Sequence, residues 1–217
     1  MEYRYLHSHL GARYADLLFA GWAADERLFA DLPDTGRDLI IVFDYSHPDL
    51  DISAWPHYAG MRLLAWSMGV WAAEHTPALT ALPLTERIAL AGTPWPIDDE
   101  RGIPSRVFNL TLSQLSGKAL ARFRHRMCSA ESHAHLMHHL PARSLDSMLT
   151  ELEMLGSRAA EPPAVRLPWD TAVIPLHDRI FPAANQLQAW QSLQVKTHAV
   201  SGSHYEPQYF SQWRKQV

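Results

Sequence analysis

The stretch of sequence that decides the fold is residues 62–74, which read RLLAWSMGVWAAE. A short apolar run leads up to Ser67, and the residues after it follow a helical pattern. A serine on a sharp turn from strand to helix projects its hydroxyl group above the sheet. Such a turn needs small residues two positions before and two positions after the serine, where Ala65 and Gly69 stand. Alanine departs from the usual glycine, and a helix N-cap is the other role open to this serine.

Apolar runs and helical patterns alternate over much of the remaining chain. Strands are expected at residues 2–7, 16–20, 39–43, 62–65, 87–91, 172–176 and 195–200. Helical patterns are seen at residues 24–32, 183–193 and 206–215. This alternation predicts an α/β fold with a mainly parallel sheet and flanking helices.

The alternation breaks between about residues 94 and 168. Four helices are expected there, at residues 104–115, 118–128, 133–139 and 145–157. We interpret the segment as a small helical cap, inserted into a single domain that spans residues 1–217. Such a cap would cover the carboxyl edge of the sheet, where α/β folds bind ligands.

Two further polar residues follow expected strands. Asp178 comes just after residues 172–176, and His204 comes after residues 195–200. Each could instead be a local cap or an exposed loop residue. The chain order Ser67, Asp178, His204 is the nucleophile, acid and base order of α/β hydrolases. The sequence therefore predicts a catalytic triad, in which histidine takes the serine proton and aspartate orients the imidazole.

The same pattern predicts the groups around the triad. Backbone amides should stabilise the developing oxyanion, and we expect them at Met68 and Trp22. Gly21 would let the backbone approach closely. Together with Gly21, Trp66 and Trp95 are expected to line the substrate pocket, because they flank the serine or follow a strand end.

Composition excludes several classes of protein. The chain has 19 Lys and Arg against 23 Asp and Glu, so a uniformly basic nucleic-acid binder is not expected. One cysteine rules out an internal disulfide framework and a multi-cysteine zinc site. No apolar stretch of about 20 residues is present, and the first residues lack a signal-peptide pattern. A cytoplasmic protein without a membrane span is expected.

Four stretches carry a resemblance to a known family. They are LLFAGWAADERLF (17–29), RLLAWSMGVWAA (62–73), AGTPWPIDDERGIP (91–104) and RFRHRMC (122–128). The chain resembles the BioG family from about residue 14 to its end. These small α/β hydrolases are pimeloyl-acyl-carrier-protein methyl ester esterases of biotin synthesis. The resemblance implies the same triad, and as substrate a carrier-bound pimeloyl chain with a methyl ester at its far end.

Charge is unevenly distributed along the chain. Residues 101–145 carry seven basic residues and one acidic residue, a net charge of +6, whereas the remainder carries −10. A basic cap would attract a strongly acidic acyl-carrier protein. The expected docking residues are Lys118, Arg122, Arg124 and Arg126, although a merely solvated helix face is the other interpretation.

Four histidines cluster at positions 133, 135, 138 and 139. His135 and His139 have the spacing of two metal ligands on a helix. Glu131 is the only acid nearby in sequence, and no suitable spacing completes a site. We therefore expect no metal site, and attribute the cluster to a solvated helix or a mobile part of the cap.

The sequence thus favours a monomeric serine esterase that needs no cofactor. A general short-acyl carboxylesterase and a thioesterase are alternatives within the same chemistry. A non-catalytic binder of acyl groups or carrier proteins is the alternative from another class, but it would not need all three triad residues.

Overall fold

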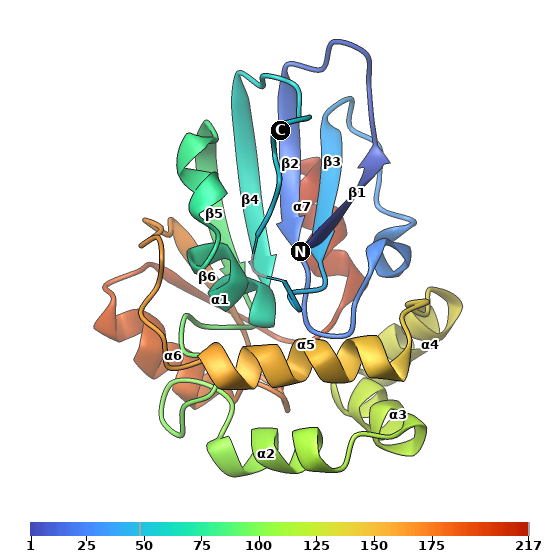
Figure 1. Cartoon of the computed structure of the whole chain (residues 1–217), viewed down its shortest axis with the longest axis vertical. Coiled ribbons are helices and arrows are strands. Elements are labelled where there is room, and N and C mark those ends of the chain that lie inside the picture. Colours follow the sequence, from blue (N-terminus) through green and yellow to red (C-terminus); the bar gives the residue numbers. More distant parts are fainter. Residues whose placement is uncertain (48, 217) are drawn as a thin grey trace.

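The computed structural model of the protein describes residues 1–47 and 49–216, which form one sheet with helices around it (Figure 1). The strands within these residues are β1 (Glu2–His7), β2 (Tyr14–Phe19), β3 (Asp38–Phe43), β4 (Gly60–Trp66), β5 (Leu84–Leu90), β6 (Thr171–Pro175) and β7 (Thr197–Val200). Their order across the sheet is β1-β3-β2-β4-β5-β6-β7. β1 pairs antiparallel with β3, and the other neighbours are parallel. The α/β class and the mainly parallel sheet predicted from the sequence are confirmed.

The centre of the sheet is its most apolar part. Every residue of β3 and β4 is buried, as is every residue of β2 after Tyr14. Strands of a parallel sheet are covered on both faces, which explains their unbroken apolar runs. These strands can therefore hold a rigid edge from which the site is built.

The α-helices form two groups, which differ in where they lie relative to the sheet. α1 (Met68–Glu74) contacts β2 and β4, and α6 (Ala183–Ser192) contacts β6 and β7, while α7 (Pro207–Lys215) is the last helix. α2 (Ser105–Ser113), α3 (Gly117–Arg126), α4 (Ala130–His138) and α5 (Leu145–Arg158) all lie between β5 and β6 in the chain. Figure 1 shows α2 to α5 gathered at the end of the sheet toward which the parallel strands point. No helix of the described residues is both long enough and apolar enough to cross a membrane.

The described residues also form two short 3-10 helices, η1 (Glu26–Phe29) and η2 (Pro77–Ala81). The sequence predicts a longer helix over residues 24–32, which is wrong. The side chain of Asp25 caps η1 by accepting from the amide of Arg27, and the helix ends after one turn. Leu28 and Phe29 are nevertheless buried, so the apolar spacing reflects packing rather than a long helix.

A cluster of buried charges lies near the amino ends of the parallel strands. The Asp16 carboxylate on β2 accepts from Arg37 and Arg62, at 2.8 and 2.6 Å, and also from Arg214 of α7. The carboxylate is inaccessible to solvent, so these hydrogen bonds compensate its loss of water. These hydrogen bonds hold α7 against the amino ends of the strands, at the end of the sheet opposite α2 to α5.

A buried carboxyl group lies at the end of α1. Glu74 accepts a hydrogen bond from the Trp169 indole at 2.8 Å and is 6 % exposed. Desolvation by burial raises the pKa of Glu74 from an ordinary value of 4.5 to about 7. The folded protein therefore holds this proton to a higher pH than the unfolded chain does.

Glu74→Gln should remove a pH dependence of stability. The protonated Glu74 carboxyl contributes to the free energy of unfolding below about pH 4.5, and this contribution is lost as the pH rises toward about 7. The variant should therefore be more stable than the parent above pH 7, by at most about 3 kcal/mol. Urea unfolding at several pH values measures the difference. Glu153→Gln, at an exposed position on α5, is the control, and an unchanged pH profile for Glu74→Gln would contradict the assignment.

Candidate active site

Ser67 stands on the turn between β4 and α1, with φ 61° and ψ −126°. This is a strained conformation for a residue other than glycine, and it is typical of a nucleophile on a strand-to-helix turn. A Cβ on Gly69 would lie 2.3 Å from the Phe19 carbonyl oxygen, and one on Gly92 would lie 2.3 Å from the Ser67 carbonyl oxygen. Both glycines let neighbouring backbone close around the turn. At the first position of the motif, Ala65 fits in the fully buried part of β4.

The three residues predicted as a triad form one chain of hydrogen bonds. His204 Nε2 lies 2.9 Å from Ser67 Oγ, and His204 Nδ1 lies 2.8 Å from Asp178 Oδ2. With its proton on Nδ1, the imidazole donates to the carboxylate and accepts from the serine hydroxyl. This arrangement can take a proton from the serine as the hydroxyl oxygen attacks an acyl carbon.

Asp178 is oriented by three further donors. Its Oδ1 accepts from the amides of Ile180 and Phe181, at 2.7 and 2.9 Å, and its Oδ2 accepts from Gln186 Nε2 at 3.0 Å. The carboxylate is inaccessible to solvent, so these bonds fix which oxygen faces His204. Sequence reasoning missed Gln186, because nothing local distinguishes it from the other glutamines of α6.

The imidazole of His204 is held from two sides. The ring of Phe181 stacks on it with centroids 6.1 Å apart and planes 5° apart. The backbone carbonyl of His204 accepts a hydrogen bond from the Trp66 indole at 3.0 Å. The base of the site is thus positioned by packing as well as by its two hydrogen bonds.

The predicted pocket residues are corrected by the structure. Trp66 packs beneath His204 and Gly21 lies behind Ser67, so neither lines the cavity at the serine. Trp95 faces a different cavity, beside Glu74, with the Arg101 guanidinium 4.2 Å from its ring centre. Within its loop, Thr93 Oγ1 donates to the Trp95 and Arg101 carbonyls and accepts from the Trp95 amide. Adjacency in sequence did not predict these directions.

The cavity at Ser67 is lined mainly by apolar side chains from the helices between β5 and β6. They include Val107 and Phe108 of α2, Phe123 of α3 and Leu152 of α5. The cavity has a volume of about 30 Å³, and its apolar side chains can contact methylene groups without leaving buried polar groups unpaired. Sequence reasoning placed these helices over the site but did not choose the lining residues.

The two predicted oxyanion donors belong to residues that line this cavity, Trp22 and Met68. Neither backbone amide donates to a protein acceptor within residues 1–47 and 49–216. The loop carrying Trp22 is held by α5, since the Trp22 indole donates to the Met148 carbonyl at 2.8 Å. Next along this loop, Ala23 has a positive φ of 64°, and its amide lies 3.4 Å from the buried Glu151 carboxylate. The oxyanion role of both amides stays a prediction.

The four predicted docking residues lie in two different places in the structure. Lys118, Arg122 and Arg124 of α3 line one groove, together with His133 and Met137 of α4. Arg126 instead lines the cavity at Ser67. Lys118, Arg122 and Arg126 are exposed, whereas desolvation by burial lowers the pKa of Arg124.

The histidine cluster differs from its prediction in one respect. Asp31 Oδ2 lies 2.8 Å from His135 Nε2, so a carboxylate does join His135 and His139. It comes from a loop 104 positions earlier in the chain, where no spacing rule could find it.

Comparisons with known proteins place this chain in a family. The model of the family described as "Pimeloyl-ACP methyl esterase BioG" matches residues 1–216. The chain belongs to the BioG family. The crystal structure of selenomethionine-labelled BioG from Haemophilus influenzae superposes with a TM-score of 0.85 at 32 % identity, over 99 % of this chain and 98 % of that one. The α/β-hydrolase fold is shared more widely. An esterase from Thermogutta terrifontis superposes with a TM-score of 0.62 at 13 % identity, over 99 % of this chain and 91 % of that one.

A second relative is longer than this chain. It is a Bacteroides fragilis protein named malonyl-acyl-carrier-protein O-methyltransferase, 40 % identical over 191 residues, which are 88 % of this chain. The match covers only 39 % of that protein, so this chain spans about two fifths of its length.

Ser67→Ala should abolish ester hydrolysis. Loss of the nucleophile should lower kcat for a short p-nitrophenyl ester by at least about a thousandfold, with the fold retained. It should also prevent covalent labelling by a fluorophosphonate, read by intact-protein mass spectrometry. Ser113→Ala, at an exposed position on α2, should behave as the parent. Hydrolysis retained in Ser67→Ala would rule out this serine as the nucleophile.

Proposed function

We propose that this protein hydrolyses the methyl ester of a pimeloyl chain carried on acyl-carrier protein. The products are methanol and a carrier-bound chain with a free carboxylate. Membership of the BioG family supports the substrate. The observation that carries the chemistry is the hydrogen-bonded chain of Ser67, His204 and Asp178 at an apolar cavity.

The proposed reaction has two halves. Ser67 Oγ attacks the ester carbonyl while His204 Nε2 takes its proton, and Asp178 stabilises the imidazolium. The amides of Met68 and Trp22 donate to the oxyanion. Methoxide then leaves with the proton from His204, as methanol. Water attacks the acyl-enzyme by the same route, its proton passing through His204 to Ser67, and the carboxylate is released.

The position of the cavity supports the proposed orientation of the substrate. With the ester carbonyl at Ser67, the methylene chain would contact Phe108, Phe123 and Leu152. The carrier end of the chain then points toward the surface of the helices between β5 and β6, where Arg126 stands. We propose that these helices, residues 94–168, act as a cap within a single domain.

The charge of the cap supports docking of the carrier protein. Lys118 and Arg122 are exposed on α3, one helical turn apart, and Arg126 follows at the same spacing. Acyl-carrier proteins are strongly acidic, and complementary charge accelerates association more than it increases final affinity. We propose α3 as the docking helix.

The name of the Bacteroides fragilis relative supports the same substrate class. A malonyl-acyl-carrier-protein O-methyltransferase is named for placing a methyl group on a carrier-bound diacid. The bond that such an enzyme makes is the type of bond that this protein would cleave.

Reversing one charge on α3 tests the docking proposal. Arg122→Glu should raise KM for a carrier-bound methyl ester several-fold, most strongly at low salt, because screening weakens the attraction. It should leave hydrolysis of dimethyl pimelate unchanged, since this small ester needs no carrier contact. Arg13→Glu, an exposed charge before β2, is the matched control. An equal effect on both substrates would contradict docking on α3.

The same substrates separate the alternative activities. Methanol should appear from the carrier-bound ester, whereas a thioesterase would release free carrier protein. A non-catalytic binder would release neither. Mass spectrometry of the carrier protein distinguishes these products directly, and loss of the whole acyl group would overturn the proposed ester specificity.

A further inference from the structure

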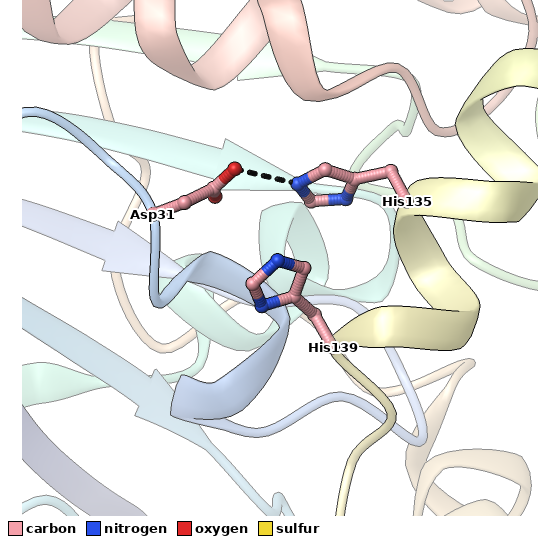
Figure 2. A group of neighbouring side chains, drawn as sticks. All are labelled: Asp31, His135 and His139. Carbon is pink, nitrogen blue, oxygen red and sulfur yellow. Dashed lines mark hydrogen bonds and ion pairs between the residues drawn. The ribbon is translucent and has the colours of Figure 1, made fainter.

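We propose that Asp31, His135 and His139 form a binding site for a zinc ion. The site joins the loop after η1 to α4, which are far apart in the chain. Figure 2 shows the carboxylate and the two imidazoles brought together between these two segments. The proposal is independent of the proposed function, because none of these residues touches the cavity at Ser67.

The geometry suits a small cation. One ligand atom from each residue lies within 4.8 Å of the others, and the pair of His135 and Asp31 is already at 2.8 Å. Tetrahedral zinc, with bonds of about 2.0–2.1 Å, brings its ligand atoms to about 3.3 Å from one another. Zinc would need the 2.8 Å pair to open by about 0.5 Å and the other ligand atoms to move closer. Asp31 is exposed and His139 caps the end of α4, so side-chain rotation can make both adjustments.

The spacing on α4 favours the same conclusion. His135 and His139 are four positions apart, and their rings are stacked, with centroids 4.5 Å apart and planes 26° apart. Residues at this spacing project from the same face of a helix. Asp31 supplies a third ligand from the opposite segment, so the ion would crosslink the two.

A hydrogen bond behind His135 is the second observation that points to a cation. Tyr205 Oη lies 3.0 Å from His135 Nδ1 and 3.3 Å from the Leu28 carbonyl oxygen. A tyrosine has one proton, which the carbonyl can accept, and its oxygen then accepts from Nδ1–H. This leaves the lone pair of His135 Nε2 facing the Asp31 carboxylate. Two such acceptors repel each other unless a proton or a metal ion neutralises the contact.

The same pattern is characteristic of metal-binding histidines. A metal-bound imidazole donates its other ring N–H to an oxygen, which fixes the tautomer and the orientation of the ring. Tyr205 is 1 % exposed and its amide donates to the Met127 carbonyl, so it is a rigid partner for His135. A proton on Nε2 is the competing way to satisfy the pair, and the experiment below separates the two.

The donor set favours a first-row transition metal. Two imidazoles and one carboxylate suit zinc, and the same set also binds iron(II), whereas magnesium and calcium prefer oxygen ligands alone. Three protein ligands leave one position of a tetrahedron for water. The ion would hold α4 against the loop that follows η1, so its main effect would be on stability.

Zinc titration of the full chain without a histidine tag tests the proposal. Isothermal titration in a buffer that does not bind zinc should show one equivalent bound, and zinc should raise Tm by several degrees over protein in EDTA. Cobalt, used as a spectroscopic substitute, should give the visible absorption of a tetrahedral site. His139→Ala and Asp31→Asn should each weaken binding at least about tenfold.

His138→Ala is the matched control, because this neighbour on α4 is exposed and is not one of the three proposed ligands. It should bind zinc as the parent does. Both test variants should keep the parent Tm in EDTA, which separates loss of a ligand from loss of folding. The proposal is overturned if the parent binds no zinc, or if the two test variants bind it as tightly as the control. Ester hydrolysis in EDTA should continue in every case.

Discussion

The turn at Ser67 depends on how closely three backbone segments can approach one another. Its positive φ is tolerated because β4 is fixed between β2 and β5, and because the surrounding backbone fills the space where side chains would stand. Gly69 lies against the end of β2, and Gly92 lies against the carbonyl of the serine itself. A buried sheet that cannot relax is thus what keeps an unfavourable conformation in place. The serine hydroxyl is exposed to the cavity for the same reason.

The helices over the site are joined to this rigid sheet by buried polar groups. Arg143 bonds Glu151 at 2.6 Å and Asp44 at 3.0 Å, and Glu151 also accepts from the amide of Tyr45 at 3.1 Å. Burial raises the pKa of the Glu151 carboxyl, while Arg143 acts in the opposite direction. Without its partner, either the Glu151 carboxylate or the Arg143 guanidinium would be a buried charge that destabilises the fold. These bonds therefore fix α5 and the segment before it relative to the sheet.

The sequence predicts those parts of the structure that depend on short local patterns of residues. The buried strands and Ser67, Asp178 and His204 could be placed, because each follows from a short pattern and from the order of parallel strands. The structure brings these three residues together as the prediction requires. The directions of Trp66 and Trp95 could not be predicted, since side-chain direction depends on packing between distant segments. Gln186 and Asp31 were missed for the same reason.

The charge cluster at Asp16 has a practical consequence for anyone who extends the chain. Arg214 of α7 bonds Asp16 at the end of the sheet farthest from the cavity. The Gln216 carbonyl accepts from Arg62 at the same end. The amino group of Met1 instead donates to the Asp49 carbonyl at 2.9 Å. An affinity handle or fluorescent reporter fused at the carboxyl end would leave the mouth of the cavity open to a bulky carrier. Fusion at the amino end would disturb a contact that the chain already makes.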